Sequence, residues 1–190
     1  MNTVSIMIVG VGGQGTLLAS KVLGKVFMSE GYDVKVSEVH GMSQRGGSVV
    51  TYVRYGERVY SPVITDGEAD FILAFEKAEA GRFAKNLKKG GKIIVNTQEI
   101  DPMPVIIGNA VYPSGVLNEL EKKGVDIYAL DALALAKEAG SAKAANVVLL
   151  AKFAKLTNIP EEKWIKAVEE TVAPKFLEMN KKAFALGYNS

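Results

Sequence analysis

Short apolar runs separated by polar turns dominate residues 1–130 of the chain. The runs are rich in β-branched residues and break at glycine, proline or charged positions, a pattern typical of strands in a buried sheet. Between several of them apolar residues recur at helical spacing, which indicates alternating strands and helices. We predict strands over residues 4–9, 33–39, 48–55, 70–75, 92–96 and 125–130, and helices over residues 15–30, 76–89 and 116–123.

After Asp131 the pattern becomes helical throughout. Pro160 and Pro174 stand where a first helical turn tolerates proline. We predict helices over residues 132–139, 145–156, 161–171 and 175–186. The expected buried faces of the last two helices consist of Trp164, Val168 and Val172, and of Phe176, Met179, Ala183 and Leu186.

Two stretches carry less regular patterns. Gly56-Glu57 is typical of a hairpin turn, so residues 58–62 are expected to return as a strand and to make the sheet mixed. Residues 101–115 contain several prolines, which predicts irregular backbone with a short strand near residues 105–107.

Together the patterns predict one three-layer α/β/α domain over residues 1–190. Its first two strands and the helix between them form a Rossmann-like start, a parallel, right-handed β-α-β unit. The sheet is expected to be mostly parallel but mixed. The final helices form a helical C-terminal extension.

Charge and hydropathy exclude some partners. The chain has 23 basic and 21 acidic residues and a net charge of +2, with no basic tract interleaved with aromatic residues. We therefore expect no nucleic-acid partner. No apolar stretch approaches the roughly 18 residues of a membrane span, and no signal-peptide pattern is present, so we expect no membrane association and a cytoplasmic location.

The chain has no cysteine and a single histidine, His40. It therefore cannot by itself supply a cysteine-ligated iron–sulfur cluster or a typical zinc site. Nucleophilic mechanisms that pair serine or cysteine with histidine would all depend on that one imidazole.

A glycine-rich turn follows the first strand, where the chain bends into the first helix. Strand, glycine turn and helix leave the N–H groups of a helix N-terminus open to a ligand. The turn could hold a pyrophosphate, with Glu38 at the end of the second strand meeting a ribose hydroxyl. Alternatively, the glycines permit close strand–helix packing or admit another subunit, and Gln14 and Thr16 only cap the helix. The candidate residues are Gly10, Gly12, Gly13, Gln14, Gly15 and Thr16.

A second polar, glycine-bearing loop follows the second strand. Open-sheet geometry places it beside the glycine turn, so that the two loops form a crevice or a docking rim. Arg45 could bind a carboxylate or phosphate in bidentate fashion, unless the loop is simply solvated. The candidate residues are His40, Ser43, Gln44, Arg45, Gly46, Gly47 and Ser48. Asn146, near the start of a late apolar helix, either caps that helix or bridges to a neighbouring loop.

Three segments carry a family resemblance. They are residues 10–15 (Gly-Val-Gly-Gly-Gln-Gly), residues 40–48 (His-Gly-Met-Ser-Gln-Arg-Gly-Gly-Ser) and residues 145–150 (Ala-Asn-Val-Val-Leu-Leu). With them, nearly the whole chain resembles the gamma-type domain of the 2-oxoacid:ferredoxin oxidoreductases. Within that family it is most similar to the small (beta) subunits of the indolepyruvate:ferredoxin oxidoreductases.

The resemblance implies a subunit that is inactive alone. Thiamine diphosphate, magnesium and 4Fe–4S clusters would lie on a larger alpha subunit, and none would be bound by this chain alone. The complex would oxidatively decarboxylate aryl 2-oxoacids with coenzyme A, giving aryl-acetyl-CoA and carbon dioxide, and would reduce ferredoxin. The loops at residues 10–16 and 40–48 would face the partner, with Gln44 and Arg45 contacting substrate, coenzyme A or the alpha subunit. No catalytic base is implied.

Three alternatives stay open. A sister enzyme acting on pyruvate or another 2-oxoacid would use a similar gamma subunit. An independent NAD(P)-dependent oxidoreductase would use the glycine turn together with Glu38. A binding or regulatory module would have no catalytic association at all.

Overall fold

The computed structural model describes residues 3–38 and 46–190, which contain one six-stranded sheet in the order β2-β3-β1-β4-β5-β6. Strands β1, β4, β5 and β6 are parallel, whereas β3 lies antiparallel to both β1 and β2. The expectation of a mostly parallel, mixed sheet is confirmed. The strands are β1 (Val4–Val11), β2 (Asp33–Glu38), β3 (Ser48–Gly56), β4 (Ala69–Ala74), β5 (Leu87–Asn96) and β6 (Asp126–Leu130).

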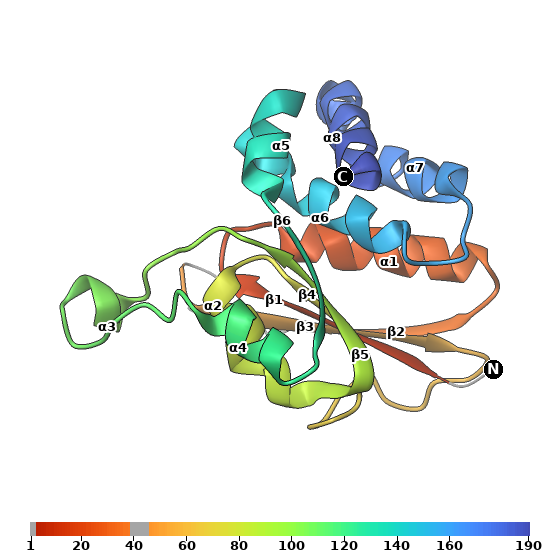
Figure 1. Ribbon diagram of the computed structural model, residues 1–190. Coiled ribbons are helices and arrows are strands. Elements are labelled where there is room, and N and C mark those ends of the chain that lie inside the picture. The colour runs from red at the N-terminus through yellow and green to blue at the C-terminus, as the bar shows by residue number, and fades with distance from the viewer. Residues whose placement is uncertain (1–2, 39–45) are drawn as a thin grey trace.

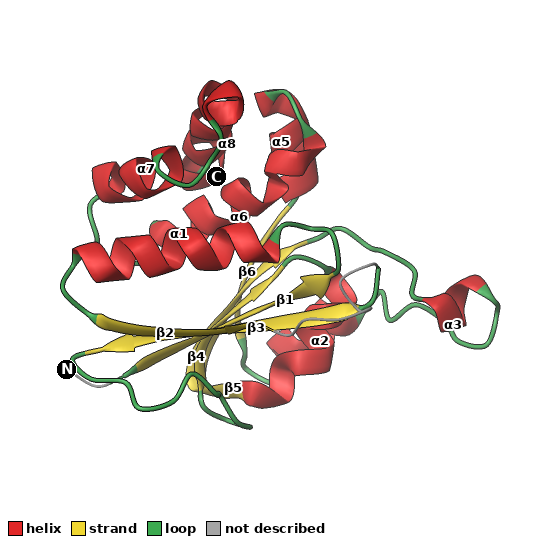
Figure 2. Ribbon diagram, turned by 180° about the vertical axis from the view of Figure 1, so that it is seen from behind, coloured by secondary structure: helices red, strands yellow, loops and turns green. Residues whose placement is uncertain are grey.

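Helices cover both faces of the sheet. In Figures 1 and 2, α1 and the C-terminal helices α5–α8 lie on one side, and α2 and α4 lie on the other. The three-layer architecture and the helical C-terminal extension are therefore confirmed. No helix within the described ranges is long and apolar enough to cross a bilayer. The helices are α1 (Thr16–Ser29), α2 (Lys77–Phe83), α3 (Met103–Ile106), α4 (Val116–Lys122), α5 (Ala132–Ala139), α6 (Ala145–Ala154), α7 (Glu161–Glu169) and α8 (Leu177–Asn189).

The alternation of side chains along β1 explains the two layers of core. Ile6 and Ile8 pack with residues of α1 and α6, whereas Met7 and Val9 pack with residues of α2 and α4. Successive strand residues point to opposite faces of a sheet, so a strand that is apolar at every position must be covered on both sides. On the α1 side Trp164 is fully buried and meets aromatic rings edge to face.

The structure corrects the predicted strand pairing. Strands β1 and β2 run parallel as predicted, but they are not neighbours, because β3 lies between them. Residues 58–62 form no strand, so the predicted hairpin at Gly56-Glu57 is wrong. The antiparallel partner of β2 is β3 itself, reached through residues 39–47.

Three local predictions were also wrong. The helix predicted over residues 76–89 ends at Phe83, and β5 begins at Leu87, before Gly90-Gly91. Residues 105–107 do not form a strand, since the structure has the short helix α3 there. Phe176 is about half exposed rather than buried.

The ring of Tyr55 in β3 stacks on Phe27 of α1, with 3.6 Å between centroids and 10° between planes. Burial raises the pKa of Tyr55 to about 12. Below about pH 10 the hydroxyl is neutral in both the folded and the unfolded chain. Between about pH 10 and 12 only the unfolded chain ionises, so the free energy of unfolding should fall by about 2.7 kcal/mol.

Replacing Tyr55 by phenylalanine should remove this part of the pH dependence. Urea unfolding of the wild type, Tyr55→Phe and the exposed control Tyr60→Phe, measured at about pH 8 to 12, tests the prediction. The wild type and the control should both lose stability above about pH 10, and Tyr55→Phe should lose clearly less. If the free energy of unfolding fell equally with pH in all three proteins, the pH dependence would not come from the raised pKa of Tyr55.

Candidate functional site

The glycine turn joins the carboxyl end of β1 to the N-terminus of α1. Gly13 and Gly15 have φ angles of 101° and 83°, a region that favours glycine. Gly15 is the N-cap of α1, and no side chain in the described ranges caps that helix. The first N–H groups of α1 are thus available to an anionic group.

Packing explains two of the glycines. A Cβ on Gly15 would lie 2.4 Å from Nδ2 of Asn146, and one on Gly10 would lie 2.9 Å from Cβ of Phe75. Asn146 Nδ2 also donates to the carbonyl oxygen of Gly15 at 3.3 Å, so Asn146 bridges α6 to the turn. Among the described residues other than its chain neighbours, none has an atom within 4 Å of a Cβ placed on Gly13, so on their side Gly13 borders open space.

The side chain of Gln14 is engaged by the protein itself. Its Oε1 accepts from the N–H of Val11 at 2.8 Å, and its Nε2 donates to the carbonyl oxygen of Phe75 at 2.9 Å. These contacts join the turn to the carboxyl end of β4. Gln14 therefore holds the shape of the turn, and it neither caps the helix nor points freely into the opening.

The described end of the second loop, residues 46–48, lies beside the glycine turn, as predicted. The N–H of Gly12 donates to the carbonyl oxygen of Gly47 at 2.8 Å, and the N–H of Gly46 donates to that of Gly12 at 3.3 Å. Ser48 Oγ donates to the buried carboxylate of Glu79 in α2. The remaining candidates, His40, Ser43, Gln44 and Arg45, lie outside the described residues.

Two hollows open on either side of Gly13 and Gly15. One, of about 260 Å³, lies toward β3 and includes Thr16, Val49 and Thr51. The other, of about 520 Å³, lies toward the ends of β4 and β5 and also borders α5 and α6. A crevice at the carboxyl ends of the strands is where open α/β sheets bind ligands.

Sequence reasoning missed part of the lining of this crevice. Phe75, Asn96 and Gln98 line the larger hollow. Asn96 donates to the carbonyl oxygen of Phe75 at 3.2 Å and accepts from the N–H of Ala132 at 3.1 Å, so it ties β4, β5 and α5 together. Their position in the sequence could have identified them as lining residues, since each stands at or just after the carboxyl end of a predicted strand.

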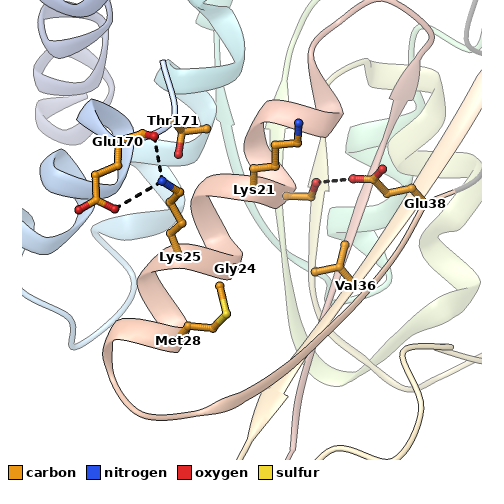
Figure 3. Close-up of a pocket in the computed structure, with 9 residues that line it drawn as sticks. Lys21, Gly24, Lys25, Met28, Val36, Glu38, Glu170 and Thr171 are labelled. Carbon is orange, nitrogen blue, oxygen red and sulfur yellow. Dashed lines mark hydrogen bonds and ion pairs between the residues drawn. The ribbon is translucent and has the colours of Figure 1, made fainter. Parts of the chain in front are cut away.

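A hollow of about 670 Å³ lies away from this crevice, between α1, β2 and the end of α7 (Figure 3). Lys25 donates to the carbonyl oxygen of Glu170 at 2.8 Å and pairs with its carboxylate at 3.4 Å. Glu38 accepts from Ser20 Oγ at 2.9 Å. Glu38 thus lines a hollow on the side of the sheet that α1 covers, and not the crevice at the glycine turn.

The position of Glu38 disfavours a dinucleotide at the glycine turn. In a dinucleotide-binding half, the strand that carries the ribose-binding acid pairs directly with the glycine-bearing strand. Here β3 separates β2 from β1, so the acid-bearing strand lies roughly 10 Å from the glycine-bearing strand, where direct pairing would place it about 5 Å away.

Comparison with known proteins decides the family. A family profile described as pyruvate ferredoxin/flavodoxin oxidoreductase matches residues 5–190. The chain belongs to this family. Among relatives, the indolepyruvate oxidoreductase subunit IorB of Thermococcus kodakarensis is 44% identical over 194 residues, covering 98% of this chain and 95% of that one. The family resemblance read from the glycine-bearing motifs is therefore confirmed.

Solved structures show the same fold. The gamma subunit of the keto/oxoacid ferredoxin oxidoreductase from Geobacter sulfurreducens matches with a TM-score of 0.72 at 24% identity, over 98% of this chain and 96% of that one. The 2-oxoglutarate:ferredoxin oxidoreductase from Magnetococcus marinus matches with a TM-score of 0.76 at 19% identity, over all of this chain and 31% of that one. The pyruvate ferredoxin/flavodoxin oxidoreductase fold thus exists both as a free-standing chain and as part of a longer one.

Proposed function

We propose that this chain is the small subunit of an indolepyruvate:ferredoxin oxidoreductase, and that residues 1–190 form a single gamma-type domain. The observation that carries the proposal is the 44% identity to a subunit of an indolepyruvate oxidoreductase over nearly the full length of both chains. The complex would convert aryl 2-oxoacids to aryl-acetyl-CoA and carbon dioxide in the cytoplasm, passing the electrons to ferredoxin.

The cofactors would reside on a larger alpha subunit. Among the described residues, no group of three or more His, Cys, Asp or Glu side chains is placed to hold a metal ion. The full sequence contains no cysteine and so offers no thiolate for an iron–sulfur cluster, which supports placing the cluster on another subunit. Thiamine diphosphate and magnesium would supply the decarboxylation chemistry there, while this subunit would shape the approach to them.

The crevice would contribute backbone donors to that approach. The open N–H groups at the start of α1 suit an anionic group such as a phosphate or a carboxylate. Gly13 leaves room for such a group to come close to the backbone. The Magnetococcus marinus enzyme was solved with coenzyme A and succinyl-CoA bound, which supports coenzyme A as the co-substrate proposed here.

A reconstitution assay tests the proposed function. The chain alone, its larger subunit alone and the purified complex are assayed for 2-oxoacid-dependent reduction of ferredoxin or a viologen dye. Indolepyruvate, pyruvate and 2-oxoglutarate are compared as substrates in the presence of coenzyme A. Only the complex should turn over, with the highest kcat/KM for indolepyruvate. Turnover by the chain alone would refute the accessory role, and a preference for pyruvate would refute the aryl assignment.

The Arg45→Ala variant tests the second loop. In the reconstituted complex it should lower kcat/KM at least about tenfold, because a bidentate charged contact is lost. The matched control is Arg58→Ala at the opposite edge of the sheet, where the guanidinium lies 5.0 Å from the centre of the Tyr60 ring. Circular dichroism should be unchanged for both variants. Equal kcat/KM for Arg45→Ala and the control would remove this loop from the site.

A further inference from the structure

An arm extends from the sheet between the end of β5 and the start of α4. Figures 1 and 2 show α3, at the tip of this arm, standing apart from the other elements of the fold. No residue of α3 is buried. The arm leaves from the carboxyl edge of the sheet, the edge that also carries the glycine turn. We call residues 103–111 the arm tip.

The arm tip presents apolar side chains to solvent. The exposed fractions are 65% for Met103, 64% for Ile106, 60% for Ile107 and 92% for Val111. Residues 103–111 contain no charged side chain. Summed over these four residues, the exposed surface is on the order of 500 Å², and a contiguous apolar patch of that size on a monomeric protein often marks a binding site.

Hydrogen bonds hold the two ends of the arm in place. The buried carboxylate of Glu76 accepts from the N–H of Ile100, at the outgoing end, at 3.1 Å, and from the hydroxyl of Tyr112 at the returning end. Tyr112 also accepts from the N–H of Ala78 at 3.1 Å. Burial and the bond to Glu76 raise the pKa of Tyr112, so its hydroxyl stays protonated and keeps donating.

The arm tip also has a defined backbone. The N–H of Ile106 donates to the carbonyl oxygen of Pro102 at 3.1 Å. The N–H groups of Asn109 and Ala110 both donate to that of Pro104, at 2.8 and 3.0 Å. Such a segment loses little conformational entropy when it binds, so it is pre-organised for docking.

We propose that the arm tip inserts into an apolar groove of the larger subunit and anchors the complex, an inference that rests on the proposed function. A stable interface takes about 800 Å² from each partner, so the tip would supply a large share of that area. In the Magnetococcus marinus enzyme the matching fold is 31% of one chain, which tethers it covalently to other parts of the protein. A separate subunit has no such tether and needs a non-covalent anchor.

The position of the arm favours the larger subunit over a second copy of this chain. The tip projects from the same edge as the crevice proposed to face that subunit. A twofold contact between two tips would bring the carboxyl edges of two copies together. That arrangement would compete with the larger subunit for the crevice.

Charge substitutions at the tip test the anchor. Ile106→Asp and Val111→Asp are compared with Val63→Asp, an exposed apolar position in the loop between β3 and β4 at the opposite edge of the sheet. Each variant is titrated against the purified larger subunit by calorimetry. The two tip variants should bind at least about 30-fold more weakly than the wild type, because a charge would enter an apolar contact. Val63→Asp should bind as the wild type does.

Two further measurements make the outcome decisive. Melting temperatures of the isolated variants should match that of the wild type, because the substituted side chains are exposed. The isolated wild type should be monomeric by light scattering. Wild-type affinity in both tip variants would overturn the anchor while leaving the proposed function intact. A wild-type dimer that Ile106→Asp dissociates would assign the tip to a second copy instead, and failure of the wild type to bind the larger subunit would refute both proposals.

Discussion

Replacing Gly187 by alanine should destabilise the protein by about 3 kcal/mol, at the upper end of the cost of overpacking. Gly187 lies in α8 where this helix crosses α6. An added Cβ would lie 2.2 Å from the carbonyl oxygen of Val148 and 2.9 Å from its carbonyl carbon. Both are backbone atoms of a buried helix, so no side-chain rotation can relieve the collision. The two helices would have to separate along their contact.

Urea unfolding followed by tryptophan fluorescence measures this effect. Trp164 is the sole tryptophan and is fully buried, so its emission reports loss of the helical layer. The matched control is Gly24→Ala in the interior of α1, where, beyond the helix's own backbone and the chain neighbours, no atom in the described part of the chain lies within 4 Å of the added Cβ. The control should gain up to about 1 kcal/mol from the higher helix propensity of alanine. Equal changes in the two variants would show that the α6–α8 contact does not require glycine.

The second large effect is expected at the glycine turn, for Gly15→Ala. The substitution adds a Cβ 2.4 Å from Asn146 Nδ2 at a residue with φ 83°. Left-handed strain and displacement of Asn146 should together lower the free energy of unfolding by about 2–3 kcal/mol. Urea unfolding of the isolated chain measures this loss.

Gly13→Ala separates folding from function at the same turn. Its φ of 101° also penalises alanine, but none of the residues that the structure describes comes within 4 Å of the added Cβ, apart from the chain neighbours. The expected loss of stability is only about 1 kcal/mol. In the reconstituted complex Gly13→Ala should instead lower kcat/KM, because the methyl group would enter the crevice. Full activity of Gly13→Ala would show that nothing approaches the turn closely there, and a larger loss of stability than for Gly15→Ala would contradict the packing explanation.

Local pattern predicted most elements but not the strand order. The apolar runs of β1, β4 and β5 identify buried strands, because each is covered on both faces. The turn signal at Gly56-Glu57 suggested a local hairpin, yet β3 pairs with β1 and β2 on its two sides. Apolar periodicity shows which residues are buried and carries no information on which strand lies next to which.

Composition also misled at the arm. The apolar stretch around residues 105–107 fits a short strand, and apolar residues are ordinarily expected inside a protein. The structure instead has α3 there, and none of the residues of α3 is buried. The sequence alone does not distinguish an exposed apolar segment such as this one from a buried segment of the core, since both are apolar.

The sequence predicted that the two loops lie side by side and gave a bridge from Asn146 to a neighbouring loop as one of two alternatives, but it identified neither the partner of Asn146 nor the contacts of Gln14. The adjacency of the glycine turn and the loop at Gly46-Gly47 follows from the rule that parallel strands end at one edge of a sheet. The bond from Asn146 to Gly15 joins residues 131 positions apart in sequence. The orientation of the Gln14 side chain likewise depends on its bond to the carbonyl oxygen of Phe75, and the spacing of residues in the sequence does not predict that contact.

The carboxylate of Glu76 accepts hydrogen bonds from both ends of the arm. Because Glu76 binds the arm at Ile100 and at Tyr112, we expect the segment between these two residues to tolerate changes of length and composition without an effect on the core. Related proteins should therefore keep a carboxylate at the position of Glu76 and a phenol at that of Tyr112. The residues between the two ends of the arm should vary together with the surface of the larger subunit that they contact. Grafting that segment between two such proteins would be expected to transfer pairing preference without refolding the host.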